Sequence, residues 1–148
     1  MIFKKVLSLT LTVFFALAAR TSSALQSRDL VGTWRLQSYT ILEDGKEKPW
    51  CVAPFGIISY YANGYMAVGI NCRDAAGQLV ANPKDMVFYT GTYDIQNGNT
   101  VVHHVENSSE LSRISQHLER SAELKGDVVT LTGKGTKGLV KLVWKKIR

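Results

Sequence analysis

From residue 28 to the C-terminus, the chain repeats short runs of alternating apolar and polar residues, separated by turns rich in glycine, asparagine and aspartate. The clearest turns lie at 43–46, 62–64, 97–99 and 126–127. Such spacing is typical of an antiparallel meander, and a meander either exposes its two edges or closes on itself. The pattern therefore predicts an all-β fold: a single eight-stranded antiparallel up-and-down β-barrel.

Strict alternation also predicts which side chains point into the barrel. In the first strand Trp34 and Leu36 face inward, whereas Tyr39 lies on the outer face. The same reasoning places Met66, Val68, Ile70, Leu142 and Trp144 inside. The eight expected strands are 30–39, 57–61, 65–72, 86–96, 100–107, 116–125, 128–132 and 139–147. A closed barrel of this size is filled by side chains or holds one small ligand.

The N-terminus has the features of a secretory signal peptide. Lys4 and Lys5 precede an apolar run over 6–19, and small residues follow at 22–24. The run is too short to span a bilayer comfortably but suits the core of a signal peptide. We expect residues 1–24 to be removed, leaving one domain over 25–148 in the bacterial periplasm or secreted. An uncleaved N-terminal anchor is the alternative.

The basic charge of the chain does not indicate a nucleic-acid partner. The formal net charge is +6, but Lys4, Lys5 and Arg20 belong to the signal peptide. The remaining cations are scattered, whereas nucleic-acid binders gather them on one face. The cluster formed by Lys141, Lys145, Lys146 and Arg148 is compatible with weak contact to an anionic membrane surface.

Both cysteines, Cys51 and Cys72, fall in the part expected to be exported. An even number in an oxidising compartment favours a disulfide. A hairpin that turns at Asn63 places Cys72 opposite Pro54, and a loop that folds back brings Cys51 within reach. Closing the loop of roughly twenty residues between the two cysteines stabilises a fold by about 3 kcal/mol in the chain-entropy model. The alternative is a reactive thiol at Cys72, activated by the adjacent Arg73.

The most informative polar residue is Arg120. It shares a strand face with Leu118 and Ala122, so alternation directs a guanidinium into the barrel, where an unpartnered cation is costly. The neighbouring strands add His103, Tyr89 and Tyr93 to the same inner surface. This cluster suits a ligand with a carboxylate, enol or carbonyl head group. The alternatives are an Arg120 that reaches the rim or pairs with an internal carbonyl or acid, and a His103 bonded to tyrosine or backbone.

Other motifs carry no chemistry. His103 and His104 are adjacent in one strand and point to opposite faces, so they cannot chelate one ion; we expect no metal and no cofactor. The glycines of 133–138 join two strands and lack the spacing of a phosphate-binding loop.

The segment 73–85 is either a lid over one end of the barrel or a plain surface loop. The polar connection 108–115 has room for one helical turn.

Several short blocks in fixed order resemble the bacterial lipocalin-like domain family. The blocks are 30–36 (LVGTWRL), 64–66 (GYM), 89–93 (YTGTY), 101–106 (VVHHVE), 131–132 (LT) and 142–144 (LVW). In lipocalins a tryptophan near the start of the first strand plugs one barrel end, and a basic residue of the last strand packs over it. The resemblance implies these roles for Trp34 and Lys146, although arginine is the expected residue at the second position. It also implies an eight-stranded barrel with a small-molecule cavity.

Three functions compete at this stage. The first is an exported, non-catalytic binder of a small hydrophobic or amphiphilic molecule in the barrel. The second is a cyclase, isomerase or hydratase in which His103 is the general acid or base, with Arg120 or Tyr93 stabilising negative charge. The third is a barrel with a filled core that acts through its surface. The expected ligand-binding residues are Trp34, Met66, Tyr89, Tyr93, His103 and Arg120.

Overall fold

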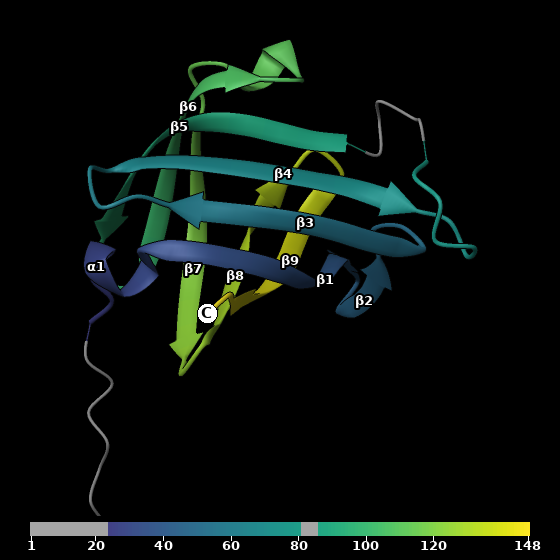
Figure 1. Ribbon diagram of the computed structural model, residues 1–148, viewed down its shortest axis with the longest axis horizontal. Helices are drawn as coiled ribbons and strands as arrows, with labels where there is room; N and C mark the ends of the chain where they lie inside the picture. Colours follow the sequence, from purple (N-terminus) through teal and green to yellow (C-terminus); the bar gives the residue numbers. More distant parts are fainter. Residues whose placement is uncertain (1–23, 81–85) are drawn as a thin grey trace, which may run out of the picture.

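The computed structural model describes residues 24–80 and 86–148 (Figure 1). The predicted signal peptide therefore lies, apart from Ala24, outside the described residues. Within the described ranges, a short helix α1 (Ser27–Leu30) leads into nine strands. None of the helices found there is long and apolar enough to cross a membrane.

The strands form one antiparallel sheet in the order β2-β1-β3-β4-β5-β6-β7-β8-β9, and pairing of β1 with β9 closes it. The result is the predicted eight-stranded barrel, with β2 as an extra strand on the end of β1 (Figure 1). The bounds are β1 (Gly32–Glu43), β2 (Lys46–Pro49), β3 (Ala53–Tyr60), β4 (Tyr65–Arg73), β5 (Met86–Gln96), β6 (Thr100–Ser108), β7 (His117–Lys125), β8 (Val128–Gly135) and β9 (Gly138–Lys146), with a 3₁₀ helix η2 (Leu111–Arg113) between β6 and β7.

The hairpin of β3 and β4 has the predicted register. Cys72 lies opposite Pro54, and Cys51 approaches from the residues that precede β3. The two sulfurs form a disulfide, with the Cα atoms 6.1 Å apart. The bond ties the start of β3 to the end of β4, at the barrel end opposite α1.

The predicted outward position of Tyr39 is wrong. Leu36 pairs with Trp144 and Ser38 with Val143, so Gln37 is an extra residue, a β-bulge in β1. A bulge shifts the alternation by one position. Tyr39 therefore turns inward, becomes buried and stacks on Trp50 with ring centroids 4.7 Å apart.

One end of the barrel is sealed by α1 and the start of β1. Leu30, expected in the first strand, instead ends α1, and its carbonyl accepts a 2.8 Å hydrogen bond from the indole of Trp34. The ammonium of Lys146 lies 5.0 Å from the centre of the Trp34 ring. The predicted cation–π contact of the last strand with Trp34 is confirmed.

The core follows the predicted alternation from β4 onward. Most side chains expected inside are buried, including Met66, Val68, Ile70, Leu142 and Trp144, as is Leu36 of β1 before the bulge. In β7, Leu118 and Ala122 are only partly buried against this core. The segment expected to be a lid or a surface loop begins with a turn at Asp74 and a bridge between Arg73 and Leu79, and its remainder, 81–85, lies outside the described residues.

Candidate ligand-binding site

His103 lies at the centre of a polar cluster inside the barrel. It comes from β6, is only 1% exposed, and receives a tyrosine hydroxyl at each ring nitrogen. The Tyr60 hydroxyl is 2.8 Å from Nε2 and the Tyr89 hydroxyl is 2.9 Å from Nδ1. A neutral imidazole has one N–H donor and one acceptor, so one tyrosine accepts and the other donates. The structure thus contains the tyrosine-bonded core histidine that the sequence left as an alternative.

The electrostatics keep this cluster uncharged. Burial, reinforced by the positive charge of Arg120 and by His104, lowers the pKa of His103 to about 3. Burial likewise raises the pKa of Tyr60 and of Tyr89. At neutral pH the three groups are therefore neutral hydrogen-bonding partners.

Arg120 points inward as predicted and is 6% exposed. Its Nη1 donates to the backbone carbonyls of Glu119 and Lys134, both at 2.9 Å. Among the described residues, no carboxylate forms an ion pair with it. The guanidinium is thus held by carbonyl oxygens but has no counter-ion.

Arg120 stands where two strands separate. The ladder of β7 and β8 ends at the pair Ser121 and Thr132, although both strands continue beyond it. An open cleft of about 770 Å³ lies between the continuing strands and the connection that contains η2. Its lining carries charges of both signs, with Arg113, Arg120, Glu110 and Glu119 among the lining residues.

The barrel interior, in contrast, is nearly full. Its cavity measures about 30 Å³ and is bounded by Tyr89, His103, Arg120 and Trp144 among mostly apolar side chains. Such a space holds about one or two water molecules, whereas small-molecule pockets measure roughly 300–1,000 Å³. The indole N–H of Trp144 is buried and has no hydrogen-bond partner. Arg113 and Arg120 line both this cavity and the cleft, so the two spaces adjoin at these side chains.

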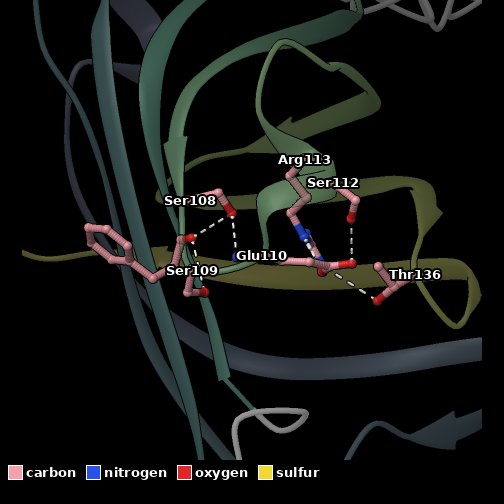
Figure 2. A network of polar contacts seen from close by, with 7 residues as sticks. Ser108, Ser109, Glu110, Ser112, Arg113 and Thr136 are labelled. Atoms are coloured by element: carbon pink, nitrogen blue, oxygen red, sulfur yellow. Dashed lines mark hydrogen bonds and ion pairs between the residues drawn. The ribbon is translucent and has the colours of Figure 1, made fainter.

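The connection between β6 and β7 is held by a network of polar contacts that reaches the turn between β8 and β9 (Figure 2). The hydroxyl of Ser108 accepts from the Glu110 amide, and the Glu110 carboxylate accepts from Arg113 Nε at 2.7 Å and from Ser112. Arg113 also donates to the hydroxyl of Thr136, in the β8–β9 turn, at 3.4 Å. The expected helical turn in this connection is η2, and it positions Arg113 at the junction of cleft and cavity.

The structure brings together half of the predicted ligand-binding residues. Tyr89, His103 and Arg120 line the interior cavity. Trp34 plugs the α1 end, and Met66 is fully packed in the core. Tyr93 also lies toward the α1 end, where its hydroxyl donates to the Tyr61 carbonyl at 3.2 Å.

Two features of the polar architecture were not anticipated. Arg113 lies in a connection without regular alternation, so the sequence gave no indication of where its side chain points. The second feature is an outward cluster in which His104 Nδ1 lies 2.6 Å from His117 Nδ1 and His104 Nε2 lies 2.9 Å from Asp94 Oδ2. Alternation already placed both histidines on the outer face of neighbouring strands, so a register for 100–107 against 116–125 would have revealed the pair.

Comparison with known proteins agrees with the barrel. A redesigned β-barrel is similar in structure, with a TM-score of 0.50 and 14% identity over 86% of this chain and 100% of the other. An uncharacterized protein from Bacteroides eggerthii gives a TM-score of 0.45 and 16% identity over 80% of this chain and 100% of the other. Among curated proteins no significant match is found. A model of the lipocalin-like domain matches residues 31–147, and the chain therefore belongs to the lipocalin-like domain family.

Proposed function

We propose that this protein is an exported binder of a small amphiphilic molecule whose anionic or carbonyl head group pairs with Arg120. The observation that carries the proposal is a buried guanidinium that uses one nitrogen on two backbone carbonyls and forms no ion pair with a carboxylate among the described residues. Burial of such a cation is costly unless hydrogen bonds and a counter-charge compensate. A carboxylate would supply both through two parallel hydrogen bonds.

The volumes of the interior cavity and the cleft limit where the ligand can lie and what kind of molecule it is. The interior cavity of about 30 Å³ is too small for the body of a ligand, whereas the adjoining cleft of about 770 Å³ has ample room. We place the head group at Arg120, most of the ligand in the cleft, and only a small apolar end toward the interior. Because charged residues of both signs line the cleft, we expect a compact acid rather than a long-chain lipid.

Two observations support export. The N-terminal residues have the basic start, apolar run and small residues of a signal peptide. Cys51 and Cys72 are joined in the structure, and disulfides persist in oxidising compartments such as the periplasm.

The filled interior also favours a second function, a barrel that acts through its surface without a resident ligand. The enzyme hypothesis receives no such support. A pKa of about 3 and two tyrosine partners leave His103 poorly suited as a general base at neutral pH.

Native mass spectrometry of the protein isolated from its own exported fraction distinguishes these functions. The binder predicts an additional stoichiometric mass that is lost in Arg120→Met and kept in Lys125→Met, a control that removes an exposed cation of the same strand. Retention of the mass in Arg120→Met contradicts the assigned head-group site. A ligand-free mass for the wild-type protein contradicts a stably held ligand and favours the surface function.

A further inference from the structure

Two histidines from neighbouring strands meet on the outer face of the barrel. His104 of β6 and His117 of β7 are direct partners in the sheet. Their Nδ1 atoms lie 2.6 Å apart, and the ring planes are inclined by 75°. At this distance one nitrogen donates a hydrogen bond and the other accepts it with its lone pair.

Asp94 of β5 determines which nitrogen accepts. Its Oδ2 lies 2.9 Å from His104 Nε2, and an ionised carboxylate only accepts hydrogen bonds. His104 Nε2 therefore carries the hydrogen, and His104 Nδ1 directs its lone pair toward His117. A carboxylate behind one ring nitrogen is the arrangement that fixes tautomer and orientation in metal-binding histidines.

We propose that His104 and His117 bind a divalent transition-metal ion through their Nδ1 atoms, with Asp94 as the positioning residue. Metal–nitrogen bonds of about 2.0–2.1 Å place two ligand nitrogens about 2.9 Å apart at a right angle and about 3.3 Å apart in a tetrahedron. From 2.6 Å, the two nitrogens must separate by about 0.3–0.7 Å, and the rings must also turn so that both Nδ1 lone pairs point at the ion instead of along the line between the nitrogens. The smaller change corresponds to square-planar geometry, so Cu²⁺ is the preferred ion, in line with its high intrinsic affinity for imidazole.

Binding requires a tautomer change but no net loss of a proton from neutral histidines. The hydrogen on His117 Nδ1 leaves for solvent, and His117 Nε2 takes one up, so both Nδ1 lone pairs become available to the ion. Within the described residues, no group of three or more histidine, cysteine, aspartate or glutamate side chains surrounds a common point. Solvent therefore completes the coordination of a two-histidine site, which predicts an exchangeable rather than a structural ion.

Calorimetric titration of the purified protein, without a polyhistidine tag, tests the proposal. The chain has only three histidines, and the third, His103, is buried with both nitrogens occupied. We expect one Cu²⁺ per chain and weaker binding of Zn²⁺. His104→Gln and His117→Gln should each abolish this binding, while Asp94→Asn should weaken it by about 10- to 100-fold. The matched control Glu106→Gln, an exposed residue of β6, should bind as the wild type does.

Absence of stoichiometric Cu²⁺ binding by the wild-type protein, or wild-type affinity in either histidine variant, would overturn the proposal. A second measurement uses the wild-type protein alone and so does not depend on the folding of variants. Zn²⁺, which is diamagnetic, should shift the Nδ1 resonances of His104 and His117 in nitrogen-15 NMR spectra and leave those of His103 unchanged. Shifts confined to Nε2, or absent at either histidine, would refute coordination through Nδ1.

Discussion

Stability should fall as the solution is acidified from pH 6.5 to pH 5.0, because His103 cannot take up a proton while the barrel is folded. The unfolded chain binds that proton near pH 6.5, whereas in the folded protein the pKa is lowered to about 3, first by burial. Unfolding therefore takes up about half a proton at pH 6.5 and nearly one at pH 5.0, and the free energy of unfolding decreases as pH falls. At about 1.4 kcal/mol per pH unit for each proton taken up, the expected loss over this interval is about 1.6 kcal/mol.

Urea denaturation followed by tryptophan fluorescence at pH 6.5 and 5.0 measures this loss. His103→Gln removes the titrating ring, so the loss between the two pH values should be about 1.6 kcal/mol smaller in the variant than in the wild type. Equal losses in both proteins would refute the reasoning. NMR of the wild-type protein gives an independent check, since the His103 ring should stay neutral at pH 5.0.

Three further changes test the packing. Gly91→Ala places a Cβ 1.9 Å from a carbonyl oxygen of the facing strand β6 and should lower the free energy of unfolding, measured by urea denaturation, by about 3 kcal/mol or more. The control Gly69→Ala has open space at the Cβ and should be neutral or stabilising. Similar effects of the two substitutions would contradict the assigned contact. Reduction of Cys51–Cys72, which closes a separation of 21 residues, should lower the free energy of unfolding by about 3 kcal/mol, and an unchanged urea midpoint would argue against the bond. Lys146→Met removes the cation above the N-terminal tryptophan ring and should lower stability by about 0.5–1 kcal/mol, whereas no change would show that the contact contributes nothing.

Alternation and the number of strands were enough to predict an eight-stranded barrel and the inward direction of Arg120, whereas the closure of the barrel became evident from the pairing of β1 with β9. The turn at Asn63 was enough to pair Cys72 with Pro54. What failed depends on contacts between strands that local patterns do not encode. The bulge at Gln37 turns Tyr39 inward only because β9 lacks a matching extra residue. Packing density likewise cannot be deduced from alternation, so the near-full interior became evident only from the three-dimensional structure.

The incomplete ladder between β7 and β8 also has a dynamic consequence. Beyond Ser121 and Thr132, backbone groups that face the cleft lack cross-strand partners, and Arg120 joins the two sides through a side chain instead. Local opening is easiest where few backbone hydrogen bonds must break. Amide hydrogens of β7 and β8 beyond Ser121 and Thr132 should therefore exchange with solvent well before those of the complete β3–β4 and β5–β6 ladders. Local unfolding of the barrel should begin between these two strands.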